Sequence, residues 1–188
     1  EIIGYSNYFF KNTENIFEVT NETQFEVKIA GIKLFSIKSI SKEKYENDHL
    51  IEFSSETIQN DKRKFVNLIY DKSKDVFIID GSSYKGKANK DYLVGTWWNH
   101  EIIKAKAQIS GISGRIIEQT VTFLGKEEIV IGNKIYNTLH FNFKSSDKTL
   151  PDSKKLNTDI WYEEDTYLWV KAAFEKTGYW EYRIKKVN

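Results

Sequence analysis

The stretch FEVKIAGIKLFSIKSI, residues 25–40, decides the fold class. Apolar and polar residues alternate from Phe25 to Ile29, which is the period of a β-strand with one face in water. Ala30-Gly31 predicts a tight turn, because glycine adopts positive φ without steric cost. Beyond the turn, the apolar residues change parity at Leu34-Phe35, which predicts a β-bulge. The stretch therefore predicts an antiparallel hairpin.

The same period of two continues through most of the chain. Turn signals recur about every ten residues, the rhythm of an antiparallel meander. Gly125 and Thr177-Gly178 are among the predicted turns. The further strands expected are HLIEFSSETI (49–58), KFVNLIY (64–70), DVFIID (75–80), GRIIEQTVTFLG (114–125), EEIVIG (127–132), KIYNTLHFNFK (134–144), TDIWYEED (158–165), YLWVKAAFEK (167–176) and YWEYRIKKV (179–187).

One segment breaks this pattern and predicts a short α-helix over about residues 98–106. Asn99 is its expected N-cap, and Glu101 lies in its first turn. The fold class expected is mainly β. It is a highly curved antiparallel sheet, or a partly open barrel or roll, of about ten to eleven strands around this helix. We expect a single domain over residues 1–188.

Composition excludes several function classes. The net charge is +1 and the chain contains only three arginines among its basic residues, so nucleic acid is not an expected partner. There is no Cys, which excludes thiolate metal sites and disulfides. No apolar run approaches the roughly 20 residues of a membrane-spanning helix, so we expect a soluble chain without a membrane span. No motif calls for a cofactor.

The chain also contains no Met, even at its first residue. A chain that starts at Glu1 is expected to be a mature or trimmed fragment. Removal of a signal peptide before Glu1 is one explanation, and trimming of the sequence is the other. The first explanation predicts a periplasmic or otherwise exported protein.

Three pieces of the second half resemble an uncharacterised family of exported bacterial proteins, defined as a domain of unknown function. They are TWWNHEII (96–103), FLGKEEIVIGNKIYNTLHFNF (123–143) and DIWYEEDTYLWVKAAFEKTGYWEYRI (159–184). The resemblance covers roughly residues 94–185 and implies an exported, curved β protein. It implies, more distantly, a likeness to lipoprotein carriers, whose curved sheets hold acyl chains; this is fold-level analogy. In the first half, Phe35 and Ile37 stand where the family has Gly and His, so no role of that His transfers.

Catalytic and metal signatures are weak. The segment HEIIK starts like a zinc-protease helix, but Lys104 occupies the place of the second His. His49, His100 and His140 lie in different predicted elements. Adjacent carboxylates such as Glu127-Glu128 point to opposite faces of a strand, so we interpret them as solvated turn flanks. The sequence therefore assigns neither catalytic residues nor metal ligands.

The aromatic residues carry the strongest functional signal. All five tryptophans fall in the second half of the chain. Most of these rings are expected to pack in a core, and a subset is expected to line an apolar or saccharide-stacking cavity. The candidate ligand-binding residues are Trp97, Trp98, Asn99, His100, His140, Trp161 and Trp169.

Three functions follow from these signals. The first is non-catalytic binding of an apolar or amphipathic, lipid-like small molecule in the concavity of a curved sheet. The alternative is an envelope module that binds a protein partner through its surface or an open sheet edge, with a solid core. The second alternative is a hydrolase or lyase that uses His100 or His140 as acid or base. The sequence favours a function without catalysis.

Overall fold

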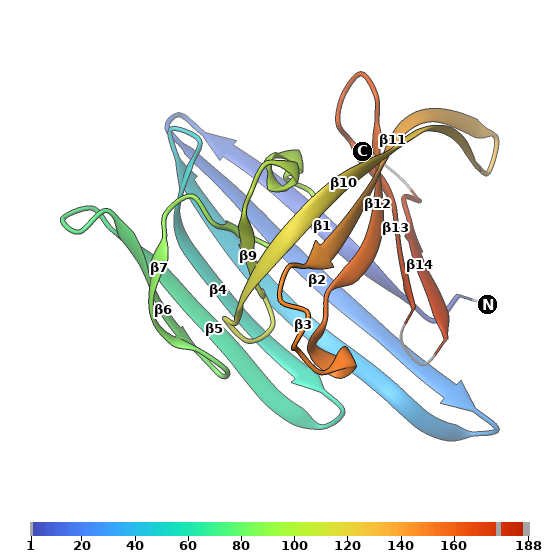
Figure 1. Ribbon diagram of the computed structural model, residues 1–188, viewed down its shortest axis with the longest axis horizontal. Coiled ribbons are helices and arrows are strands. Elements are labelled where there is room, and N and C mark those ends of the chain that lie inside the picture. The colour runs from blue at the N-terminus through green and yellow to red at the C-terminus, as the bar shows by residue number, and fades with distance from the viewer. Residues whose placement is uncertain (1, 176–177, 186–188) are drawn as a thin grey trace. The chain divides into compact units, whose positions relative to one another are not determined.

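The computed structural model describes residues 2–175 and 178–185 and is mainly β. Within these ranges the chain forms 14 strands and two short 3₁₀ turns. The strands form two seven-stranded sheets (Figure 1). The contacts divide the chain into two compact units, residues 1–91 with 109–116 and residues 92–108 with 117–188. Each unit is described by itself, and the expected single domain stays a prediction.

The first sheet is an antiparallel meander in which each strand pairs with the next along the chain. One row of side chains on its buried face runs through Val19, Glu43, Phe53, Leu68 and Ile79, all at most 2% exposed. The strands are β1 (Gly4–Thr13), β2 (Ile16–Ile29), β3 (Ile32–Glu46), β4 (His49–Gln59), β5 (Lys62–Asp71), β6 (Val76–Gly81) and β7 (Lys85–Asn89).

The hairpin predicted over residues 25–40 is confirmed as the end of β2 and the start of β3. Ala30 and Gly31 both have positive φ, 49° and 79°, as a two-residue turn with the right twist requires. The pairing passes from Val27↔Phe35 to Lys28↔Lys33, which leaves Leu34 as the extra residue of a bulge. The change of parity in the sequence therefore located the bulge correctly.

The second sheet has the order β14-β13-β12-β11-β10-β9-β8. Its buried core is formed by Ile102, Phe141, Phe143, Ile160, Tyr162 and Ala172. The strands are β8 (Leu93–Val94), β9 (Ala107–Ile109), β10 (Ile116–Ile131), β11 (Lys134–Ser145), β12 (Asn157–Glu163), β13 (Trp169–Glu175) and β14 (Tyr179–Arg183). A second 3₁₀ turn, η2 (Asp152–Lys154), lies in the loop between β11 and β12.

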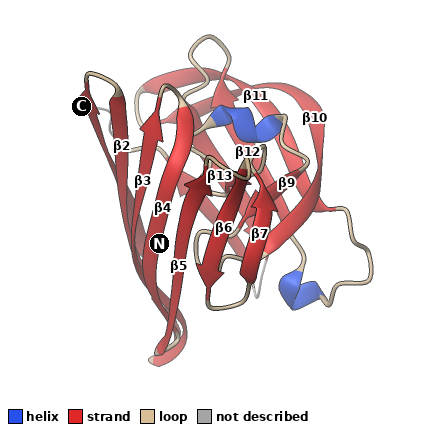
Figure 2. Ribbon diagram, turned by 90° about the vertical axis from the view of Figure 1, so that its left-hand side faces the viewer, coloured by secondary structure: helices blue, strands red, loops and turns tan. Residues whose placement is uncertain are grey.

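The α-helix expected over about residues 98–106 is wrong. The segment forms only η1, a single 3₁₀ turn over His100–Ile103 (Figure 2). Asn99 caps this turn as expected. The Gln119 side-chain amide donates to the carbonyls of Ile102 and Ala105, which would otherwise accept the next helical N–H groups. The chain then enters β9, whose sheet pairing replaces further helical hydrogen bonds.

The expected count of ten to eleven strands is too low, because four strands were missed. The short strands β7, β8 and β9, and the edge strand β1, carry no clear alternation and were not predicted. In the other direction, Gly125 was expected to end a strand but lies inside the 16-residue β10. Its φ of 138° and a register shift between Phe123 and Gly125 mark a bulge that bends the strand without ending it. Of the predicted Thr177-Gly178 turn, Thr177 lies outside the described residues, as do 176 and 186–187 of the last two predicted strands.

Candidate functional site: the two faces of the second sheet

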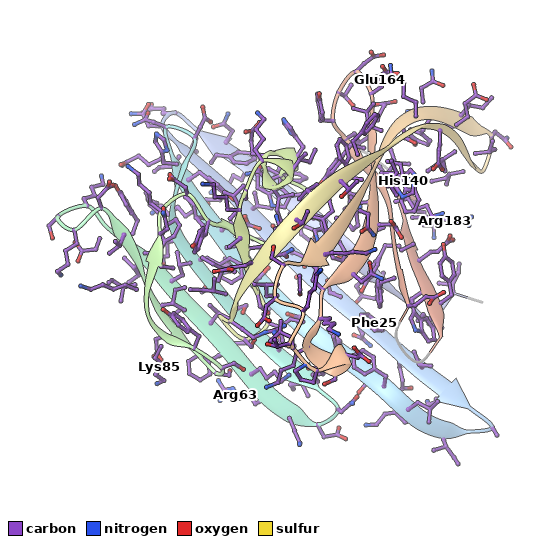
Figure 3. The ribbon with its side chains drawn as sticks, viewed as in Figure 1. Phe25, Arg63, Lys85, His140, Glu164 and Arg183 are labelled. Carbon is purple, nitrogen blue, oxygen red and sulfur yellow. The ribbon has the colours of Figure 1, made fainter. Side chains whose placement is uncertain are left out.

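Successive side chains of β11 and β12 point to opposite faces of the second sheet. His140 and Trp161 therefore lie on one face, and Phe141 and Tyr162 on the other. The register pairs His140 with Trp161, Trp161 with Lys171 and Lys171 with Arg183, so four strands contribute one row of side chains. Figure 3 labels His140 and Arg183, the two ends of this row. We call this side the polar face, and the side with Phe141 and Tyr162 the aromatic face.

His140 is the centre of the polar face. Its Nδ1 lies 2.6 Å from Glu127 Oε1 and its Nε2 lies 3.2 Å from Asp159 Oδ1. The side chain is 13% exposed. His140 thus bridges β10 and β12 through contacts of both ring nitrogens.

Trp161 is enclosed beside this bridge. The His140 ring stacks on it at 4.1 Å between centroids, and Lys171 Nζ lies 4.3 Å from its ring centre. The indole Nε1 donates to Glu127 Oε2 at 3.1 Å, and the residue is 5% exposed. Because its neighbours on both adjacent strands cover it, Trp161 has little free ring surface for a ligand.

Glu181 completes the polar face. It accepts from Lys171 at 2.7 Å and Tyr179 at 2.9 Å, and Arg183 is a further donor. Burial alone would raise the pKa of Glu181, but these donors outweigh it and hold the pKa at about 2. The pKa of Tyr179 is raised by burial and by its hydrogen bond to Glu181. The polar face is therefore a network of paired charges.

The aromatic face is different in character. Trp97 meets Trp169 and Tyr182 edge to face, at centroid distances of 5.7 and 6.1 Å. All three rings are only partly buried and pack against the core that contains Tyr162. Burial raises the pKa of Tyr182 to about 12, so its hydroxyl stays neutral. Phe174 lies 6.3 Å from Tyr182 and extends this group.

Trp97 is held in an unusual backbone conformation. Its φ is 61°, in the left-handed region that bulky side chains rarely adopt. The Tyr162 hydroxyl donates to the Trp97 carbonyl at 2.8 Å and thereby fixes this conformation. The indole Nε1 is buried, and it has no hydrogen-bond acceptor in the part of the chain that the structure describes.

The family model for the domain of unknown function DUF6134 matches residues 1–185. The chain belongs to the DUF6134 family. The predicted membership in an uncharacterised family is thus confirmed, and the match extends beyond residues 94–185 into the first half of the chain. Searches of curated proteins and of solved structures gave no significant match.

In this DUF6134 domain the predicted ligand-binding residues do not form one group. His140 and Trp161 are in contact on the polar face, and Trp97 and Trp169 on the aromatic face. Asn99 caps η1 by accepting from the Glu101 N–H at 3.1 Å. The two remaining residues lie at the same turn: the His100 ring stacks on Tyr167 at 4.6 Å, and the Trp98 N–H donates to the Thr96 carbonyl. Their ligand-binding role stays a prediction.

Several residues of these clusters were not predicted from the sequence. Glu127 was interpreted as a solvated turn flank, yet it binds both His140 and Trp161. The Gly132-Asn133 turn could have indicated this, because a hairpin closed there pairs Glu127 with Thr138, diagonally next to His140. Asp159, Lys171 and Glu181 had no such local signal, because their neighbours depend on the register of β12, β13 and β14.

The structure offers little for metal chemistry. Among the described residues, no three His, Cys, Asp or Glu side chains are arranged to hold a metal ion. Glu127 and Asp159 bind opposite nitrogens of His140, so they do not converge on one point. No helix in the described ranges is long and apolar enough to cross a membrane.

A hollow of about 360 Å³ lies in the other unit, beside the β1–β2 and β3–β4 turns. It contains none of the residues predicted to bind a ligand. Phe17 and Tyr45 contribute aromatic surface, and its rim is polar, formed by Asn12, Glu14, Asn15, Asn47 and Asp48.

Proposed function

We propose that this DUF6134 domain binds an apolar or amphipathic, lipid-like small molecule on the aromatic face of the second sheet, without catalysis. Trp97 is the observation that carries the proposal. A left-handed backbone at such a residue costs of order 1–3 kcal/mol, and such conformations gather at sites where function requires them. Here the conformation brings the Trp97 indole against Trp169 and Tyr182.

The chemistry of the aromatic face fits such a ligand. Its rings are partly exposed, so they offer apolar area that a chain or ring system would remove from water. The Trp97 N–H supports the proposal, because a polar head group would supply the acceptor that this donor lacks. An amphipathic ligand has both the apolar part that would cover the rings and the polar group that would accept from the Trp97 N–H.

The polar face supports a function without catalysis. A hydrolase or lyase that uses His140 needs a ring nitrogen that reaches the substrate. Both nitrogens of His140 are already within 3.2 Å of a carboxylate oxygen. His100 stacks on Tyr167 and lies 3.3 Å from Glu101, the carboxylate next to it in the chain.

An exported location is part of the same proposal. Lipid-like ligands need a protein to carry them through water, and the sequence resemblance implies export. Expression of the protein from its complete gene and fractionation of cells would test this location. Recovery of the protein only in the cytosolic fraction would refute it.

The test begins with native protein that is purified without detergent, denatured and extracted for mass spectrometry. We expect a lipid-like molecule in the extract. The purified protein is then titrated with cis-parinaric acid as a defined probe, in the wild type and in Trp97→Phe. Loss of one hydrogen bond of about 0.5–1.5 kcal/mol should weaken binding roughly 2- to 10-fold.

Trp161→Phe is the matched control, since it removes one tryptophan from the opposite face of the same sheet. It should leave the affinity for the probe unchanged. Near-ultraviolet circular dichroism of both variants checks that each remains folded. An empty extract together with equal affinities of the three proteins would refute the proposal.

A further inference from the structure

β1 is the outermost strand of the first sheet. Within the described chain it pairs with β2 on one side only, so its other backbone edge is available to another strand. Eight of its ten residues are exposed. Tyr5, Phe9 and Phe10 are among them, with exposed fractions of 51%, 54% and 55%. β1 therefore presents a long, open and aromatic edge.

The opposite edge of the same sheet is built differently. β7 has only five residues, of which Lys85 and Lys87 are charged. Short edges with lysines discourage pairing with other chains. β1 is twice as long and carries one charge, Lys11. One edge of this sheet is thus protected against a partner strand, and the other is not.

We propose that β1 pairs antiparallel with β1 of a second copy of this chain. The two-fold axis passes between the two Phe9 residues, which lie directly opposite each other. The charges disfavour the parallel alternative. Parallel pairing in register would place the two Lys11 side chains against each other, which is unfavourable. Antiparallel pairing centred on Phe9 instead places Lys11 opposite Asn7, with no like charges facing across the new ladder.

The aromatic side chains favour the same register. A ladder of aromatic rings lies on the buried face of the first sheet. It runs from Tyr8 and Phe10 of β1 to Phe17 of β2 and Tyr45 of β3, with successive centroid distances of 6.3, 6.1 and 6.0 Å. In the proposed register Phe10 of one copy faces Tyr8 of the other, so the ladder continues across the axis. On the other face, Phe9 meets Phe9, an aromatic pair of the kind that stabilises adjacent strands.

The size of the contact sets its strength. A ten-residue strand is about 34 Å long, and such an edge alone buries less than the roughly 1,600 Å² of a standard stable interface. The dimer is therefore weak and concentration-dependent. The interface uses the first sheet only, so this inference stands or falls separately from ligand binding by the second sheet.

The first experiment uses the absence of Cys in the chain. In Phe9→Cys the two thiols face each other across the axis. Directly opposite residues have Cα atoms about 4.5–5.5 Å apart, within the range of about 4.4–6.8 Å that a disulfide spans. We expect a disulfide-linked dimer under mild oxidation. Phe123→Cys, at a residue 53% exposed in the second sheet, is the matched control and should form no disulfide-linked dimer.

Sedimentation equilibrium of the chain without cysteine gives the second readout. The mass should rise from 22.1 kDa towards twice that value as the concentration increases into the high micromolar range. Phe9→Lys places like charges together and should keep the protein monomeric, whereas Ile69→Lys, at a residue 59% exposed within the same sheet, should not. A wild type that stays monomeric, or equal cross-linking of both cysteine variants, would overturn the proposal. Pairing of β1 with a strand of a different protein, without self-association, would also overturn it.

Discussion

Replacement of Glu181 by glutamine tests the charge network of the polar face. The pKa of this carboxyl falls from 4.5 to about 2 in the folded chain because Lys171, Tyr179 and Arg183 donate to it against the effect of burial. A shift of this size corresponds to about 3 kcal/mol of unfolding free energy. The Glu181 side chain is 18% exposed and Arg183 is 54% exposed, so screening by solvent reduces the expected loss in Glu181→Gln to about 1–2 kcal/mol.

The pH dependence gives this prediction its sign. A carboxyl whose pKa is lowered on folding stabilises the folded state fully above the unfolded pKa of 4.5, and the contribution is lost as the pH falls to about 2. The unfolding free energy of the wild type should therefore exceed that of Glu181→Gln by the full amount of about 1–2 kcal/mol at pH 7, and this difference should shrink below pH 4.5.

Urea unfolding followed by tryptophan fluorescence at several pH values measures this difference. Glu56→Gln is the matched control, because the Glu56–Arg63 pair is 65% and 72% exposed and should contribute about 0.5 kcal/mol or less. A Glu181→Gln protein as stable as the wild type at pH 7 would show that the network does not stabilise the fold. A difference that does not change with pH would refute the electrostatic explanation.

Three further substitutions address single contacts, each measured by urea unfolding. Asn99→Ala should lower the free energy of unfolding by about 0.5–2 kcal/mol, because it removes the cap of η1. Asn99→Ser should retain most of that stability, and equal losses in the two variants would contradict a capping role. Tyr162→Phe should cost about 0.5–1.5 kcal/mol and alter the near-ultraviolet signal of Trp97, since its hydroxyl holds the Trp97 carbonyl; an unchanged spectrum would argue against that constraint. Gln119→Leu should cost about 2–4 kcal/mol, because it leaves the buried Gln108 amide and two backbone carbonyls without their partner; a neutral effect would refute this accounting.

Local pattern predicted the parts of the fold that depend on neighbouring residues. The hairpin at residues 25–40 and its bulge at Leu34 followed from alternation and one turn, because both are set by residues adjacent in the chain. The Asn99 cap was found for the same reason. The helix after it was wrong, because Gln119, distant in sequence, takes the carbonyls that a helix would have used.

In the candidate sites, too, features set by neighbouring residues were predicted and features set by distant residues were not. Residue pattern was sufficient to predict a β-rich chain, the tryptophans in its second half as candidate ring clusters, and membership in an uncharacterised family. The contacts of His140 and Trp161 with Glu127, and the position of Trp97 and Trp169 on the opposite face, became visible only in the folded chain. Strand register explains the difference, because a shift of one residue moves every side chain of a strand to the other face. Between β11 and β12 a long loop intervenes, so no local turn signal in the sequence gives that register.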